Sequence, residues 1–249
     1  MASRSWTTPA LVLSLNSFGE SHREAVLLTA DRGLIKAAVF GGPKSSLRGL
    51  VSPWHSGTAW IYSDPVKNSH KITDFSVECW RTPLRENLVR TWAANLASEL
   101  CLRSHGTADW TLINAFLDGI TVSNEAECRI GTLRFLWRFL IANGTQPDLS
   151  ECSLCGSTGQ NSQNGVLYYT QHEDTLLCRA CVRPGQMSFP VGTESRQYLE
   201  AVGSLPPAQV RAVQISDETT AELRNLLFFL TARLVGGPLH TIEAGAGIL

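Results

Sequence analysis

Two pairs of cysteines, each with the spacing Cys-x-x-Cys, constrain this chain more than any other feature. The first pair is Cys152 and Cys155, and the second is Cys178 and Cys181. This spacing lets both thiolates of a tight knuckle point at one cation, and two knuckles complete a tetrahedral site. Four thiolates leave no open coordination position, so the pattern predicts one structural zinc ion that contributes to folding.

The alternative interpretations are a pair of disulfides, or buried cysteines without a partner. The chain has 249 residues and seven cysteines, whereas a secreted disulfide scaffold is usually much shorter and has an even number. Both facts favour metal in a reducing compartment. Cys79, Cys101 and Cys128 lie singly within strand or helix patterns, and we expect them to pack in the core.

The first 80 residues show the alternation of residue types that is typical of β-strands. Five such runs are separated by turn signals that contain Gly, Asn, Asp or Pro. The runs lie at residues 11–15, 25–29, 35–39, 58–62 and 73–77. Five short strands predict a small barrel or sandwich, and the five-stranded oligonucleotide-binding (OB) barrel is the natural candidate.

From residue 81 onward the apolar residues recur every three or four positions, as in amphipathic helices. The stripes cover residues 84–100, 110–120, 130–140 and 223–234, with a short helix around 196–202. The cysteines fall between these stripes, with a polar loop and two possible short strands. The sequence therefore predicts an α+β chain. An OB-like barrel occupies residues 1–80, and a helical-bundle domain occupies 81–249 with a four-cysteine zinc ribbon inserted at about 150–185.

A stretch without acidic residues runs from position 32 to position 63. It contains several cations and is interleaved with Trp54, Trp60 and Tyr62. Cations that follow phosphates and rings that stack on bases suit a single-stranded nucleic acid. Trp60 and Tyr62 could equally fill the core of a small barrel. The candidate DNA contacts are Arg23, Arg32, Lys36, Lys44 and Arg48.

Patterns typical of enzymes are missing from the sequence. It has no Gly-rich phosphate loop, no Gly-x-Ser-x-Gly and no His-Glu-x-x-His, and its six histidines are scattered. We therefore expect a protein that is not an enzyme. No run of about 18 apolar residues occurs, and residues 1–15 lack the apolar core of a signal peptide. We expect a cytoplasmic protein.

The order of barrel, helices, cysteine segment and closing helix resembles the bacterial recombination protein O family. The most specific similarity runs from Leu133-Arg-Phe-Leu136 through Gly144-Thr-Gln-Pro147-Asp-Leu149 to the first cysteine pair and Gly156. Weaker similarities are Leu11-Val-Leu13 with Phe18-Gly-Glu-Ser21, Leu27-Leu-Thr29 through Gly33 and Ile35, and the loop Gly41-Gly-Pro-Lys-Ser45.

The resemblance implies a DNA repair protein that mediates recombination in association with the nucleoid. Members of the family bind single- and double-stranded DNA and anneal complementary strands. They act with RecR to load the RecA recombinase onto DNA coated by single-stranded-DNA-binding protein, and they bind the acidic C-terminal tail of that coating protein. Lys44 and Arg48 then match the family's basic loop, and the four cysteines match its Zn²⁺-binding members.

Two features depart from the usual family pattern, and they keep other interpretations open. The loop has fewer cations than is usual in the family, and the formal net charge is −1. Few phosphate contacts give a shallow salt dependence. A scaffold that binds only proteins would also fit this charge. A zinc hydrolase or deaminase would need a water-bound metal, which four cysteines argue against.

Overall fold

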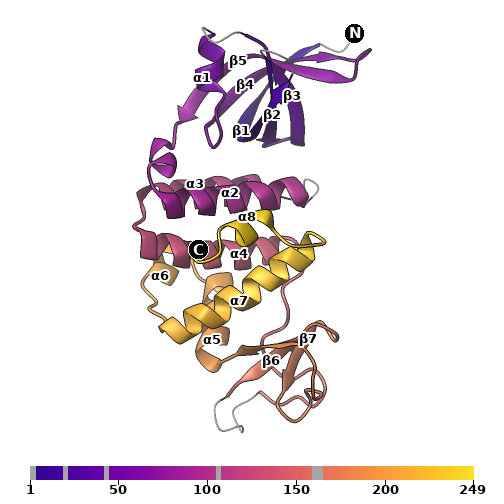
Figure 1. Cartoon of the computed structure of the whole chain (residues 1–249), viewed down its shortest axis with the longest axis vertical. Coiled ribbons are helices and arrows are strands. Elements are labelled where there is room, and N and C mark those ends of the chain that lie inside the picture. Colours follow the sequence, from indigo (N-terminus) through magenta and orange to yellow (C-terminus); the bar gives the residue numbers. More distant parts are fainter. Residues whose placement is uncertain (1–3, 19–21, 42–44, 105–107, 159–164) are drawn as a thin grey trace. The chain divides into compact units, whose positions relative to one another are not determined.

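The computed structural model describes residues 4–18, 22–41, 45–104, 108–158 and 165–249 (Figure 1). Contacts divide the chain into two compact units. The first comprises residues 1–128 and 239–249, and the second comprises residues 129–238. Among the described residues, no helix has both the length and the apolar character that crossing a membrane requires.

Five strands close into a barrel in the first unit. Around the barrel the order is β1-β2-β3-β5-β4, and β4 pairs again with β1. All neighbours are antiparallel except β3 and β5, which are parallel. The prediction of a five-stranded OB-like barrel is therefore confirmed. The strands are β1 (Ser5–Phe18), β2 (His22–Thr29), β3 (Gly33–Val39), β4 (Ser56–Asp64) and β5 (Ser69–Cys79).

Alternate residues of these strands point into the barrel, as the period of two requires. The core includes Val12, Leu27, Ile61 and Phe75, all of them almost completely buried. A short helix, α1 (Ser46–Leu50), joins β3 to β4 and packs apolar side chains against this core. The sequence did not indicate α1, because five residues are too few to show a helical period.

Three helical segments follow the barrel in the same unit: η1 (Thr82–Arg85), α2 (Leu88–Arg103) and α3 (Trp110–Val122). The helices predicted around α2 and α3 are present. The first stripe was expected from residue 84, but α2 begins four residues later because Asn87 caps it by accepting a bond from the Arg90 amide (3.1 Å). Asp109 caps α3 in the same way, through the Leu112 amide (2.9 Å).

Arg81 connects the barrel to α3, and its side chain is only 3% exposed. The guanidinium donates to the Asp118 carboxylate (2.7 Å) and to the Asn114 side-chain oxygen (2.9 Å) on α3. It also donates to the Trp54 carbonyl (2.9 Å) and to the Ser56 hydroxyl (3.1 Å) on the barrel side. A buried guanidinium is stable only when its donors are paired, so these bonds fix the barrel against α3.

Glu99 attaches the C-terminal end of the chain to α2. Its carboxylate accepts bonds from the backbone amides of His240 and Thr241, both 2.8 Å. These amides begin α8 (His240–Ala244), so a carboxylate supplied by α2 satisfies the first donors of a helix distant in sequence. The hydrogen bonds lower the Glu99 pKa even though burial acts to raise it.

The second unit combines helices with a small sheet. It contains most of α4 (Glu125–Ala142), with α5 (Thr193–Ser204), α6 (Pro207–Arg211) and α7 (Asp217–Leu234). The sheet has the order β7-β6-β8. The two expected ribbon strands are present as β6 (Leu167–Thr170) and β7 (Thr175–Cys178). The third strand, β8 (Ser188–Val191), was not indicated by the sequence.

Helices α5 and α7 each supply a carboxylate to the start of the other. Glu222 of α7 accepts from the Gly192 amide (3.0 Å) and the Ser195 hydroxyl (2.6 Å) at the start of α5. Glu194 of α5 accepts from the Ser216 hydroxyl (2.7 Å) and from the Thr219 hydroxyl at the start of α7. Charge-assisted bonds at both N-termini hold the two helices in a fixed register.

Candidate metal centre and nucleic-acid interface

The four cysteines predicted as ligands lie together in the second unit. Their sulfur atoms are all within 4.8 Å of one another, and the Cys155 and Cys178 sulfurs are 3.7 Å apart. Zinc–sulfur bonds of about 2.3 Å in a tetrahedron place sulfurs about 3.8 Å apart. The spacing of the cluster therefore fits a metal ion held by four thiolates.

Local backbone structure brings the two knuckles together. The first turns at Gly156, whose φ is +69° and whose amide donates to the Cys152 carbonyl (2.9 Å). The second follows the end of β7, where the Cys181 amide donates to the Cys178 carbonyl (2.9 Å). A bond from the Ser153 amide to a carbonyl of β7 (3.0 Å) holds the first knuckle against the second.

The thiols of this cluster differ in how readily they ionise. Burial opposes ionisation of Cys152, but hydrogen bonds from the backbones of Cys178, Cys155 and Leu154 lower its pKa to about 6. The pKa of Cys181 is raised to about 12, first by its hydrogen bonds with the Cys178 and Cys155 sulfurs. One thiolate forms readily, whereas Cys181 keeps its proton first through those hydrogen bonds and to a smaller extent through the charge of Cys152. Four ionised thiolates at this spacing would repel one another, and a divalent cation removes that repulsion.

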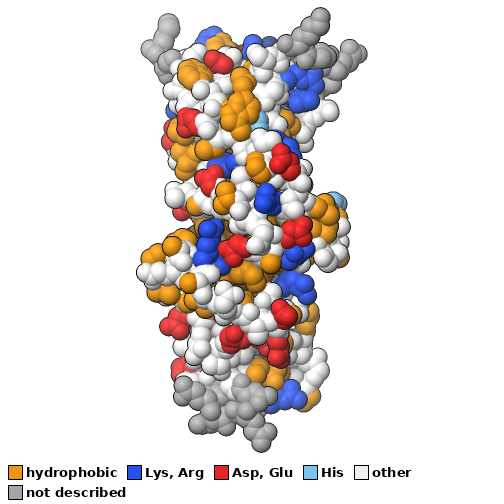
Figure 2. Space-filling view, turned by 90° about the vertical axis from the view of Figure 1, so that its left-hand side faces the viewer, with side chains coloured by type: hydrophobic (Ala, Val, Ile, Leu, Met, Phe, Trp, Pro, Cys, Tyr) orange, Lys and Arg blue, Asp and Glu red, His pale blue; other side chains and the backbone are white. Residues whose placement is uncertain are grey.

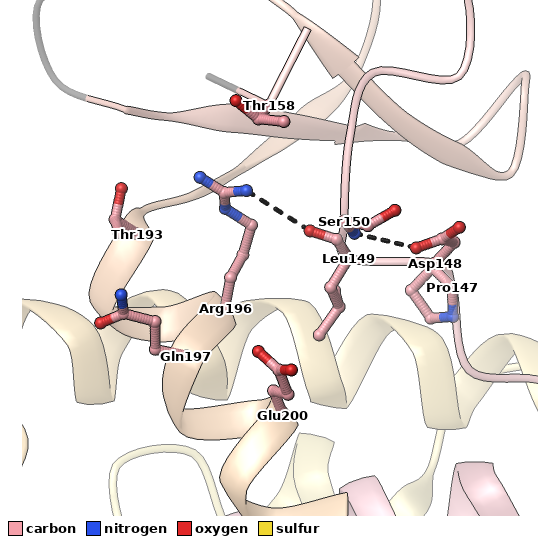
Figure 3. Close-up of a pocket in the computed structure, with 9 residues that line it drawn as sticks. All are labelled: Pro147, Asp148, Leu149, Ser150, Thr158, Thr193, Arg196, Gln197 and Glu200. Carbon is pink, nitrogen blue, oxygen red and sulfur yellow. Dashed lines mark hydrogen bonds between the residues drawn. The ribbon is translucent and has the colours of Figure 1, made fainter. Parts of the chain in front are cut away.

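A pocket of about 480 Å³ lies between α5 and the segment that leads into the first knuckle (Figure 3). The Arg196 guanidinium crosses it and donates to the Leu149 carbonyl (3.4 Å) and the Gly165 carbonyl (2.9 Å). Burial lowers the pKa of Arg196. This arginine therefore anchors the start of the cysteine segment and the start of β6 to one helix. The sequence pattern did not single out Arg196.

The predicted DNA contacts do not form a single cluster. Arg23 of β2 and Arg48 of α1 line one depression, together with Ser45, Ser46 and Gly49. Lys36 is exposed on β3. Arg32 lies in the turn at the opposite end of β2 from Arg23; it pairs with Asp31 (3.5 Å), and its guanidinium lies 4.1 Å from the ring centre of Trp6. Lys44 lies outside the described residues.

The aromatic residues that interleave the basic stretch divide between core and surface. Trp54 is 5% exposed and donates its ring N–H to the Ser98 hydroxyl (3.2 Å), so it is a packing residue. Trp60 is 38% exposed, because its neighbour Ile61 takes the inward position on β4. The core alternative is therefore wrong for Trp60. Phe40, at the end of β3, is 40% exposed and was missed because it ends an apolar run.

Several other basic side chains contribute to the fold instead of to a charged surface. Arg138 on α4 donates to the Val202 carbonyl of α5 (3.1 Å), and Arg134 on the same helix is 6% exposed and donates to the Tyr198 hydroxyl (3.5 Å). His55 is 4% exposed, and burial lowers its pKa, so it is neutral at pH 7. On the face seen in Figure 2, Lys and Arg are interspersed with Asp and Glu.

Comparison with known proteins matches most of the chain to one protein family. A family model described as the N terminal of recombination protein O matches residues 1–78, and one described as its C terminal matches residues 85–242. A protein named DNA repair protein RecO in Bacillus subtilis (strain 168) is 22% identical over 224 residues, which cover 87% of this chain and 84% of that protein. A protein of the same name in Anaeromyxobacter sp. (strain K) is 30% identical over 184 residues, covering 70% and 69%.

Proposed function

This chain belongs to the recombination protein O family of DNA repair proteins, and from that premise we propose that it is a recombination mediator. In this role it binds single- and double-stranded DNA, anneals complementary strands, and acts with RecR to help load RecA onto DNA coated by single-stranded-DNA-binding protein. It binds the tail of that coating protein and breaks no covalent bond. Its place of action is the nucleoid, in the cytoplasm.

The observation that carries the proposal is the first depression on the barrel, where Arg23 and Arg48 come together from β2 and α1. Two guanidinium groups at one site suit a phosphate, because each presents several N–H donors in a planar fork. Contacts to phosphate bind every sequence alike, as a protein that acts on any damaged DNA requires.

For the metal centre we propose one Zn²⁺ held by Cys152, Cys155, Cys178 and Cys181. The 3.7 Å separation of two of the sulfurs, and the position of all four within 4.8 Å of one another, support this assignment. When bound, the ion would cross-link the two knuckles. Four thiolates leave no site for a reacting water, so we assign the ion no catalytic role.

Strand annealing tests the function directly. Complementary strands coated with single-stranded-DNA-binding protein are mixed with and without this protein over a salt series. We expect the protein to accelerate annealing and the effect to fade as salt rises. The double variant Arg23→Ala/Arg48→Ala should lose most of the acceleration. A control, Lys67→Ala/Arg183→Ala, removes the same charge at exposed sites elsewhere and should retain it.

A second candidate, a scaffold that binds only proteins, is favoured by the net charge of −1 and the interspersed surface charges. The two candidates differ at low salt, where even a weak DNA-binding protein binds because few counterions compete. If the protein binds neither single- nor double-stranded DNA at low salt, the mediator function is rejected and the scaffold function is favoured.

A further inference from the structure

A second depression adjoins the one that contains Arg23 and Arg48. The two share Ser45 and Ser46. The walls of the second depression are different in character, because it is lined by Phe40 and several apolar groups, with a few polar side chains at its edge. Its other lining residues are Leu47, Leu50, Lys71, Ile72, Thr73 and Asp74. A cationic hollow thus lies beside an aromatic one, at the end of the barrel where β3 leads into α1.

Phe40 is held in place by its neighbours but remains accessible. The His22 ring meets it edge-on, with ring centres 4.7 Å apart and an angle of 66° between planes. The Lys71 ammonium lies 5.1 Å from the ring centre. Strand pairing keeps Arg23 and Lys71 close to the ring. Arg23 pairs with Val39, the residue before Phe40, and Lys71 pairs with Ala38 on the same strand. An exposed ring among cations suits stacking on a nucleobase.

The backbone after Phe40 positions the wall between the two depressions. Gly41 has a φ of +133°, a conformation that side chains other than hydrogen rarely permit. A Cβ placed on Gly41 would lie only 2.5 Å from the Cβ of Ser45. Ser45 therefore rests directly on Gly41, and this close approach depends on the glycine.

We propose that the two depressions form a nucleotide subsite for single-stranded DNA, in which one unpaired base stacks on Phe40 and its phosphate lies between Arg23 and Arg48. The subsite rests on the DNA binding proposed above and adds to it a preference for unpaired strands. A base within a duplex is stacked and paired already, so it cannot reach the ring without being flipped out.

The charges of the two depressions set the orientation of the nucleotide. Asp74 lies on the wall of the aromatic depression, and its carboxylate repels a phosphate there. The arginine depression has no acidic residue among its described lining residues. The phosphate is therefore directed to the arginines and the base to the ring.

The variant Phe40→Leu tests the subsite, because it removes the ring and keeps an apolar side chain. Affinity is measured by fluorescence anisotropy for a single-stranded oligonucleotide and for the matching duplex. We expect the single-strand affinity to fall about tenfold, within the range measured for loss of one stacked base. The duplex affinity and the salt dependence should not change. Trp80→Leu, which removes a half-exposed ring outside both depressions, is the matched control.

The outcomes separate the subsite from the function on which it rests. If Arg23→Ala/Arg48→Ala weakens DNA binding while Phe40→Leu leaves single-strand affinity unchanged, the stacking proposal is overturned and the DNA-binding barrel stands. Equal losses of single-strand and duplex affinity in Phe40→Leu would also overturn it. If the unmodified protein binds neither DNA form at low salt, the proposed function fails, and the subsite fails with it.

Discussion

The barrel and the cysteine ribbon are both small β-structures, yet different forces hold them. The barrel closes through strand pairing on all sides and surrounds a continuous apolar core. The ribbon has strands of only four residues, and its two knuckles meet at four sulfurs that repel one another once ionised. Large buried side chains such as Tyr169 and Leu176 lie in its strands, whereas the buried residues described in the knuckles are the ligands Cys152 and Cys178.

This difference determines what each region shows in its sequence. The ribbon depends on a few ligands at fixed spacing, which are easy to recognise. The barrel depends on many apolar residues that are individually replaceable, and the binding surface proposed for it uses residues from β2, β5, α1 and the end of β3 that only the fold brings together. The following predictions test whether the ribbon depends on metal and the barrel does not.

Removal of the metal should have the largest effect. Zinc binding contributes about 10–16 kcal/mol to the folding of zinc-finger peptides, so chelation at neutral pH should unfold the two knuckles. Hydrogen exchange followed by mass spectrometry should show lost protection around residues 150–158 and 178–183, with protection in β1 to β5 unchanged. Equal loss of protection in both regions would show that the barrel depends on the metal as much as the ribbon does. No loss in either region would show that the metal does not stabilise the ribbon.

Acidification should produce the same pattern without a chelator. Metal binding needs deprotonated sulfurs, so protons compete with the ion and metal affinity falls as pH falls. Without a metal, hydrogen bonds from neighbouring backbone groups lower the Cys152 pKa to about 6 although burial opposes its ionisation. A bound-metal assay across pH, with Cys152→Ser as the comparison, measures this dependence.

The Arg81→Ala variant should have the next largest effect, and in the barrel unit. It leaves the buried Trp54 carbonyl and the partly buried Asn114 oxygen without the donor that they share. Unsatisfied buried groups cost about 1–3 kcal/mol each, so we expect a loss of about 2–4 kcal/mol in the free energy of unfolding. Urea denaturation measures it, with Lys67→Ala, an exposed lysine of the same unit, as a control expected to change stability by less than about 0.5 kcal/mol. A loss no larger than that control would show that the four bonds of Arg81 are not needed.

Much of the architecture could be predicted from the sequence, for reasons that particular residues illustrate. The alternation at residues 35–39 predicted β3 because inward and outward positions differ in hydrophobicity. The Cys-x-x-Cys pairs predicted the metal cluster because the ligands of each knuckle are local. Arg81 could not be found in this way, since its four acceptors come from two other parts of the chain. Phe40 was hidden because an exposed aromatic that ends an apolar run has the same local pattern as a buried one.

Glu99→Gln should have a smaller effect on the same unit. The carboxylate accepts from His240 with one oxygen and from Thr241 with the other, whereas the amide side chain keeps one acceptor oxygen and loses the charge, so we expect a loss of about 1–2 kcal/mol at pH 7. Because the folded-state pKa of Glu99 lies below its unfolded value, its contribution is present at neutral pH and is lost as pH falls through the folded pKa. The stability difference between Glu99→Gln and the unmodified protein should therefore vanish in acid; a difference independent of pH would assign the effect to packing.

Lys36→Ala should have the smallest effect, and it concerns binding instead of folding. Lys36 is exposed on β3, so its removal should change stability by less than about 0.5 kcal/mol. If it contacts a phosphate, DNA affinity falls for every sequence alike, and the slope of affinity against salt concentration decreases by about one. Arg183→Ala, an exposed cation of the ribbon segment, is the counterpart. An equal change in slope for both variants would show that DNA contacts both regions. The barrel and the ribbon would then differ in what stabilises their folds and not in DNA binding.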